Sequence, residues 1–370
     1  MKVVAASGRA PAAMFVDPSE RREAFASVAD RRPASTSAVP VDLAGFFDRK
    51  LPLLTGGQSS AAAPCQAVWQ GTLYEPLREF LGRPSKNLRA RLVQHGWRLG
   101  GGRGAPPPDL CLLPEILHSA SLIVDDIQDG AHTRRGGAAL HRLIGVEQAL
   151  NAANWLYFWP HALLPTLVLP AGRQHRCADL VTRVLLDCHR GQALDLGVQV
   201  WALAPDVVQA VVAEQSRLKT GRLTALCTGL GAIAAGARPD RVALLQQFGE
   251  QVGVALQMLD DLTAVLLPAR HDKAGEDLRC GRPTWVWALA ARECSPDHYR
   301  ALTLRAQTAA MDGHWQPVCA ALAAVLAPVG LDPAREALAT AGRVLADHLA
   351  GDAALAQMLN DLDGLERAYG

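Results

Sequence analysis

Several features that mark other classes of protein are missing from this sequence. No apolar run reaches the roughly 18 residues that a membrane-spanning helix needs. The net charge at neutral pH is only +1, so bulk electrostatics give no case for nucleic-acid binding. No segment alternates apolar and polar residues over the length of a strand. These absences exclude a membrane span and favour a helical globular protein.

The cysteines lack the spacings that would give them a role. The eight cysteines form no C-x-x-C pair and no arrangement with histidine that is typical of a zinc site. The N-terminus has no apolar segment of the secretory type, and its acidic residues argue against an organellar transit peptide. We therefore expect scattered reduced thiols in a cytoplasmic protein.

The composition that is present suits helices. Hydrophobic residues make up 49% of the chain but aromatic residues only 5%, and alanine is abundant. Residues 1–45 are rich in Ala, Pro, Ser and Arg and have little periodic apolar content, which predicts a flexible N-terminal extension. Residues 46–370 are expected to form one all-α domain.

Three carboxylates follow an apolar run in the first half of the chain. Asp125, Asp126 and Asp129 stand at positions i, i+1 and i+4, so the first and last lie one helical turn apart. Clustered like charges are costly unless a cation neutralises them, and Mg²⁺ favours a few carboxylates combined with substrate phosphates. Arg134 and Arg135 follow closely. The pattern predicts a diphosphate bound through a metal, with a solvated helix cap as the alternative.

This stretch carries a resemblance to a known family. Asp-Asp-Ile-Gln-Asp at 125–129, followed by Arg134-Arg135-Gly136, resembles the first aspartate-rich motif of the trans-isoprenyl diphosphate synthases. The segment 117–154 is most similar to the geranylgeranyl diphosphate synthases of eukaryotic type. Further motifs agree in order over about residues 75–290. The resemblance implies an all-α fold, a single helical bundle around a central cavity, and a homodimer.

A pair of cations precedes the aspartates along the chain. Lys86 and Arg89, at i and i+3, can face one way at the start of a helix. They resemble the family's Gly-Lys-x-x-Arg motif, with Ser85 in place of Gly, which implies binding of isopentenyl diphosphate. The resemblance adds His118 and Arg135 to this donor site. Taken alone, such a cation pair is typical of a solvated helix face, and a lone histidine of a core.

A second acidic motif lies in the second half of the chain. It reads Asp260-Asp261-Leu262-Thr263-Ala264, whereas the family pattern is Asp-Asp-x-x-Asp. Ala264 therefore removes one potential oxygen ligand, while Asp260 is retained as the expected metal contact. Gln192 and Asp195, in a stretch that resembles the family's Gly-Gln-x-x-Asp, could orient neighbouring cations.

The resemblance also assigns the allylic substrate. Mg²⁺ is expected on Asp125, Asp126, Asp129 and Asp260. The cations that would stabilise the allylic diphosphate are Arg134, Lys219 and Lys273. Thr220 and Gln257 would present oxygen dipoles to the allylic carbocation.

The implied reaction is a head-to-tail prenyl transfer. Isopentenyl diphosphate would be condensed with dimethylallyl, geranyl or farnesyl diphosphate to give geranylgeranyl diphosphate, with the released diphosphate supported by metal and cations. The small residues Ala120 and Ser121, about one turn before the aspartates, are expected to leave a product channel open. Two alternatives remain: a terpene cyclase, which needs no second diphosphate site, and a non-catalytic subunit of a heteromeric prenyl synthase.

Overall fold

The computed structural model describes residues 41–55, 63–349 and 353–367. Its first helix, α2, begins at Leu43, a few residues before the predicted start of the domain at residue 46. The predicted N-terminal extension otherwise falls on residues 1–40, outside the described residues, so its flexibility stays a prediction.

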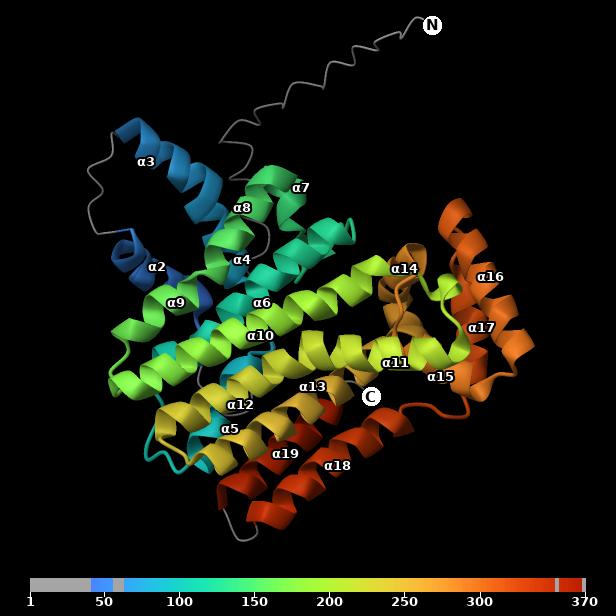
Figure 1. Cartoon of the computed structure of the whole chain (residues 1–370). Coiled ribbons are helices and arrows are strands. Elements are labelled where there is room, and N and C mark those ends of the chain that lie inside the picture. The colour runs from blue at the N-terminus through green and yellow to red at the C-terminus, as the bar shows by residue number, and fades with distance from the viewer. Residues whose placement is uncertain (1–40, 56–62, 350–352, 368–370) are drawn as a thin grey trace, which may run out of the picture.

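The all-α prediction is confirmed, because nearly all the described elements are helices (Figure 1). The first half contains α2 (Leu43–Leu54), α3 (Ala63–Trp69), η1 (Gln70–Tyr74), α4 (Glu75–Gly82), α5 (Leu88–Leu99), α6 (Pro108–Gln128), α7 (Leu140–Ile144), α8 (Val146–Tyr157), α9 (Trp159–Leu163), η2 (Leu164–Thr166) and α10 (Ala171–Gly197). The second half contains η3 (Val200–Ala202), α11 (Pro205–Ser216), η4 (Arg217–Gly221), α12 (Arg222–Ala235), α13 (Pro239–Leu266), η5 (Pro268–Arg270), α14 (His271–Cys280), α15 (Trp285–Glu293), α16 (Pro296–Asp312), α17 (Gln316–Leu326), α18 (Asp332–Leu349) and α19 (Ala353–Arg367). Among the described residues, none of these helices has the length and hydrophobicity that a membrane crossing requires.

One short β-hairpin was not predicted from the sequence. Strands β1 (Thr133–Arg134) and β2 (Gly137–Ala138) pair antiparallel across Arg135 and Gly136, and both of these turn residues have positive φ angles, 51° and 80°. Two positive φ angles are the mark of a type I′ hairpin turn. Strands of two residues are too short for an alternating pattern to reveal them.

Helix α12 lies at the centre of the bundle. It packs against α5, α10 and α13, and every residue from Leu223 to Ala234 is buried (Figure 1). A helix that is apolar on all sides is a core helix. Helix α6, which carries the first aspartate motif, packs against α5, α8 and α12. The aspartates are therefore attached to the rigid centre of the fold.

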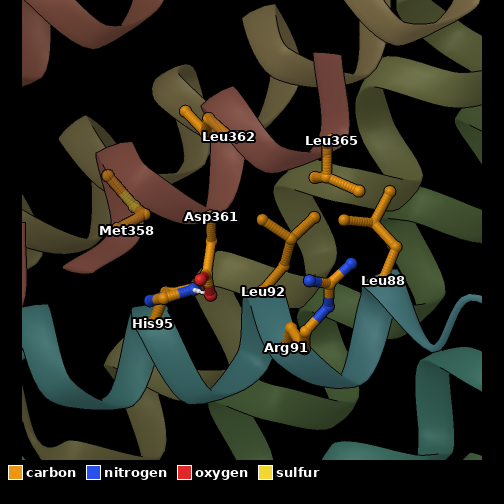
Figure 2. A pocket seen from close by; sticks show the side chains of 8 residues that line it. All are labelled: Leu88, Arg91, Leu92, His95, Met358, Asp361, Leu362 and Leu365. Atoms are coloured by element: carbon orange, nitrogen blue, oxygen red, sulfur yellow. Dashed lines mark hydrogen bonds and ion pairs between the residues drawn. The ribbon is translucent and has the colours of Figure 1, made fainter. Parts of the chain in front are cut away.

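The C-terminal helix α19 packs against the face of α5 shown in Figure 2. His95 Nε2 lies 2.9 Å from Asp361 Oδ2, and leucines from both helices surround this pair. Burial lowers the pKa of His95, although Asp361 partly opposes this effect. The end of the chain thereby supports the helix that begins with Leu88 and Arg89.

An aromatic cluster joins the N-terminal helix α2 to the body of the protein. The rings of Phe47 and Trp159 are stacked with centroids 5.0 Å apart, and Trp155 meets Trp159 edge-on at 5.3 Å. Phe46 and Phe47 are fully buried and Trp159 almost so. Large aromatic side chains dominate core energetics when they are buried in this way.

We predict that Trp159→Ala lowers the free energy of unfolding by about 3–5 kcal/mol, because it leaves a large cavity between α2 and α9. The adjacent Phe158 is 68% exposed, so Phe158→Ala serves as the matched control and should change stability by less than about 0.5 kcal/mol. Denaturant unfolding followed by circular dichroism measures both. Equal effects in the two variants would contradict the role of the cluster.

Candidate active site: aspartates paired with cations

The first aspartate motif ends helix α6, and its carboxylates point to different partners. Asp125 Oδ1 accepts a hydrogen bond from Gln192 Nε2 at 2.9 Å and lies 3.7 Å from Lys219 Nζ. Burial raises the pKa of Asp125, and Lys219 opposes this effect. Gln192 was predicted to orient a neighbouring cation; in the structure it instead holds an aspartate of the motif.

The two other aspartates of this motif each contact an arginine. Asp126 is fully buried and its Oδ1 accepts from Arg134 Nε at 2.7 Å and also from Nη2 of the same side chain. Asp129 Oδ1 accepts from Arg282 Nη2 at 2.7 Å. The Oδ2 atom of Asp126 is buried without a hydrogen-bond partner. A buried carboxylate oxygen without a partner is costly and is a natural position for an added ligand.

Lys219 reaches the aspartates from a short π-helix. Segment η4 (Arg217–Gly221) interrupts the helical course between α11 and α12, as π-bulges often do at functional sites. Lys219 Nζ donates to Asp195 Oδ2 at 2.9 Å. A Cβ on Gly191 would lie 2.8 Å from the backbone nitrogen of Lys219, so this glycine allows α10 and η4 to approach closely. Burial alone would lower the pKa of Lys219, but Asp125 and Asp195 raise it.

The second acidic motif on α13 is also paired with cations. Asp260 Oδ1 accepts from Arg270 Nη2 at 2.7 Å, and its Oδ2 accepts from Lys273. Lys273 was predicted from the sequence to lie here, but Arg270 was not. It belongs to no motif, and only the turn η5 brings it back onto the helix that carries Asp260.

A chain of hydrogen bonds joins the predicted Thr220 and Gln257 to the second acidic motif. Thr220 Oγ1 donates to Gln257 Oε1 at 2.7 Å, and Gln257 Nε2 donates to Asp261 Oδ1 at 2.7 Å. Asp261 Oδ2 in turn accepts from the backbone N–H of Trp285 at 2.9 Å. Burial, followed by the nearby Asp277, raises the pKa of Asp261 to about 7. The chain fixes the orientation of both side chains that were expected to face the substrate.

Ala264 occupies an interior position. It is buried and lines a small cavity together with Asp261, Ala274 and Asp277. Burial raises the pKa of Asp277 to about 6. At residue 264 the methyl group of alanine packs between α13 and α14 in place of the acidic side chain, while Asp260 stays partly exposed and paired with its cations.

A separate cluster consists of His118, Arg89 and Arg135, for which no ion pair with an aspartate is found among the described residues. Burial lowers the pKa of His118 well below its usual value, and Arg89, Arg135 and Arg134 lower it further. Burial, and repulsion from Arg89, lower the pKa of Arg135 to about 10, although Glu115 opposes them. The Nε of Arg89 and the Nη1 of Arg135 are buried without hydrogen-bond partners. Mutually repelling cations with unpartnered N–H groups are arranged to receive an anion.

Lys86 lies between this cluster and the second acidic motif. Burial lowers its pKa first, and Arg270 lowers it further. Burial lowers the pKa of Lys273, and Asp277 opposes this effect. Repulsion from Arg134 and Lys86 lowers the pKa further. These mutual effects indicate that Lys86 lies near Arg270 and Lys273, the two cations paired with Asp260.

The donor atoms around the aspartates fit a hard divalent cation in their chemistry, since Mg²⁺ prefers carboxylate oxygens. The unpartnered Oδ2 of Asp126 is one such oxygen. Within the described part of the chain, no group of three or more acidic, histidine or cysteine side chains converges as a ready-made metal site. Each aspartate of the two motifs is held by a neighbouring lysine, arginine or glutamine instead. The assignment of metal to Asp125, Asp126, Asp129 and Asp260 therefore stays a prediction.

The comparisons with known proteins bear on this geometry. A family model described as polyprenyl synthetase matches residues 70–319. A geranylgeranyl pyrophosphate synthase of Penicillium janthinellum is 34% identical over 217 residues, which cover 56% of this chain and 54% of that protein. Another, from Macrophomina phaseolina, is 30% identical over 232 residues, covering 61% and 67%. The chain thus spans about half to two thirds of the length of these curated relatives.

Solved structures of low sequence identity share the fold. A polyprenyl synthase from Caulobacter crescentus, complexed with calcium and isoprenyl diphosphate, superposes with a TM-score of 0.64 at 22% identity, covering 89% of this chain and 97% of that one. A geranylgeranyl pyrophosphate synthase superposes with a TM-score of 0.69 at 18% identity, covering 88% and 97%. The helical bundle predicted from the resemblance is confirmed. Because the family model covers more than half of the sequence, this chain belongs to the polyprenyl synthetase family.

Proposed function

We propose that this protein is an isoprenyl diphosphate synthase that condenses isopentenyl diphosphate with an allylic diphosphate to give geranylgeranyl diphosphate. The observation that carries the proposal is the presence of two neighbouring clusters of charged side chains that differ in composition. One consists of cations with unpartnered guanidinium nitrogens, and the other of aspartates paired with cations. A prenyl transfer needs both, because it brings together two diphosphates that react differently.

The donor site takes the diphosphate that is not released. Lys86, Arg89, His118 and Arg135 are assigned to it. The unpartnered nitrogens of Arg89 and Arg135 can donate to phosphate oxygens without first losing a protein partner. A lowered pKa keeps His118 neutral near pH 7, where it can still donate one N–H. This site requires no metal.

The allylic site takes the diphosphate that leaves. Asp125, Asp126, Asp129 and Asp260 would hold Mg²⁺, and the calcium in the Caulobacter protein supports a divalent cation in this family. Mg²⁺, when bound, supplies positive charge to the leaving diphosphate. The cations now paired with these aspartates, Arg134, Lys219 and Lys273, would then be available to the phosphate oxygens.

Other side chains act on the allylic cation. The hydroxyl of Thr220 donates a hydrogen bond to Gln257 Oε1, so the lone pairs of the hydroxyl oxygen can face positive charge. The Asp261 carboxylate holds the Gln257 amide in place. Apolar residues of α6 and α8 exclude water, which would otherwise capture the carbocation.

We also propose that the protein is a cytoplasmic homodimer. Val146 and Leu150 lie one turn apart on α8 and are 50% and 40% exposed, and Leu186 on α10 is 64% exposed. Exposed large apolar side chains that neighbour one another, as Val146 and Leu150 do, are typical of association between subunits. The free cysteines suit a reducing compartment.

The direct test is an incubation with Mg²⁺, isopentenyl diphosphate and each of the three allylic primers, followed by mass spectrometry. The proposal expects geranylgeranyl diphosphate to accumulate only when isopentenyl diphosphate is present. A hydrocarbon or terpene alcohol formed without isopentenyl diphosphate would identify a cyclase. The absence of any product would favour the non-catalytic subunit.

We predict that Arg89→Ala raises the KM for isopentenyl diphosphate by about ten-fold or more, because it removes a charge-assisted hydrogen bond. The KM for the allylic substrate should change little, since Arg89 belongs only to the donor site. Steady-state kinetics with one substrate varied at a time measures both constants. Parallel increases in the two values would contradict the separation of the sites.

We predict that Ser121→Phe shortens the product from geranylgeranyl to farnesyl diphosphate. Ser121 lies one turn before Asp125 on α6 and is only partly buried, with its hydroxyl donating to the carbonyl of His118 at 2.9 Å. An added ring cannot be absorbed by close-packed surroundings and would close the channel at this depth. The product distribution is read by mass spectrometry, with Ser121→Ala as the control that keeps the volume small. An active Ser121→Phe variant that still forms geranylgeranyl diphosphate would show that the chain does not pass this residue.

A further inference from the structure

Arg83 is a buried arginine that no motif includes. It caps the C-terminal end of α4, three residues before Lys86, and its side chain is 2% exposed. A buried guanidinium is costly unless most of its five N–H groups find acceptors. Its partners therefore indicate what holds it in place and what it holds.

Four hydrogen bonds satisfy this guanidinium. Its Nε and Nη2 donate to the two carboxylate oxygens of Glu79 at 2.9 and 2.8 Å, in a bidentate pair one turn back on α4. Its Nη1 donates to the backbone carbonyls of Arg134 and Ala138, both at 2.9 Å. These carbonyls belong to β1 and β2, so a single side chain joins both strands of the hairpin to α4.

The hairpin needs such an external contact. Its strands have two residues each, and an isolated two-stranded hairpin is at best marginally stable in water. Arg135 adopts a φ of 51°, in the left-handed region that residues other than glycine rarely enter. The guanidinium carbons of Arg83 and Arg135 lie 5.1 and 5.9 Å from the centroid of the Phe80 ring, which adds a second link from α4.

Gly137 shows how closely the two parts fit. A Cβ at this position would lie 2.9 Å from Cζ of Arg83 and 3.1 Å from its Nη2. The φ of Gly137 is not in the positive range, so alanine is permitted by the backbone and opposed only by Arg83. Gly137→Ala therefore disturbs the same contact from the side of the hairpin.

We propose that Arg83 is a positioning residue for the donor diphosphate: it locks the hairpin that carries Arg134 and Arg135 onto the segment that carries Lys86. It acts without touching the substrate, because its side chain is buried and four of its five N–H groups already have protein acceptors. This inference rests on the proposed function, since it assigns Arg135 and Lys86 to isopentenyl diphosphate. The spacing of the donor-site cations would then depend on one buried side chain.

The test compares Arg83→Met, Arg83→Lys and Gly137→Ala with the wild type by steady-state kinetics. A misplacement of binding groups by about 1 Å can cost up to about a hundred-fold, so we expect the KM for isopentenyl diphosphate to rise by about ten- to hundred-fold. The KM for the allylic substrate should rise less. Arg83→Lys should not restore the wild-type value, since an ammonium cannot form the fork of four bonds.

The matched control is Arg78→Met. Arg78 also lies on α4 and its Nε donates to both carboxylate oxygens of Asp48, but its side chain is 59% exposed and this contact joins α4 to α2 rather than to the hairpin. This variant should keep both KM values. Isothermal titration with isopentenyl diphosphate alone gives the same comparison without turnover, and thermal unfolding shows whether each variant is folded.

Arg83→Met combined with Gly137→Ala should be no worse than the more severe single variant, because both break one contact. Folded variants with an unchanged KM for isopentenyl diphosphate, rescue by Arg83→Lys, or additive effects in the double variant would each overturn the inference. A wild-type protein that forms no prenyl product would instead overturn the proposed function.

Discussion

The structure depends on the pairing of buried and partly buried aspartates with cations from other segments of the chain. Asp125, Asp126 and Asp129 lie at the end of α6 and Asp260 lies on α13, whereas their cationic partners come from β1, η4, η5, α14 and the segment between α14 and α15. Carboxylates grouped this closely would repel one another without positive neighbours. The cations therefore stabilise the aspartates in the absence of ligand, and they are also the groups that a diphosphate would recruit. Folding and ligand binding thus draw on the same charges.

The donor site follows a different principle, since Arg89, His118 and Arg135 crowd one another and two of their guanidinium nitrogens are buried without hydrogen-bond partners. The repulsion among Arg89, His118 and Arg135 lowers the pKa of His118, after the larger effect of burial. Such a cluster persists only if surrounding structure holds it in place. That support comes from the buried core beneath α5, from the C-terminal helix α19, and from the hydrogen bonds of Arg83 to the hairpin. The site is strained before its ligand arrives, which favours anion binding.

Much of this arrangement could be predicted from the sequence. The carboxylate spacing after an apolar run indicated a metal-assisted diphosphate site, and the order of the motifs indicated the fold, which the comparisons confirmed. The sequence could not indicate the roles of Arg83 and Arg270. Arg83 binds backbone carbonyls, which any residue possesses, in a segment distant along the chain. Arg270 reaches Asp260 only because a turn brings it back to α13. Nor could it show that Ala264 points into the core.

We infer that binding of the allylic diphosphate depends on metal, whereas binding of isopentenyl diphosphate does not. Isothermal titration with a single substrate, with and without Mg²⁺, tests it without turnover. We expect Mg²⁺ to strengthen the binding of farnesyl diphosphate by more than about ten-fold, because its charge replaces the cations on the aspartates, and to leave the binding of isopentenyl diphosphate nearly unchanged. Asp125→Asn should reduce the effect of Mg²⁺ on the binding of farnesyl diphosphate and leave the binding of isopentenyl diphosphate unchanged. An equal dependence of both ligands on Mg²⁺, or none for farnesyl diphosphate, would contradict it.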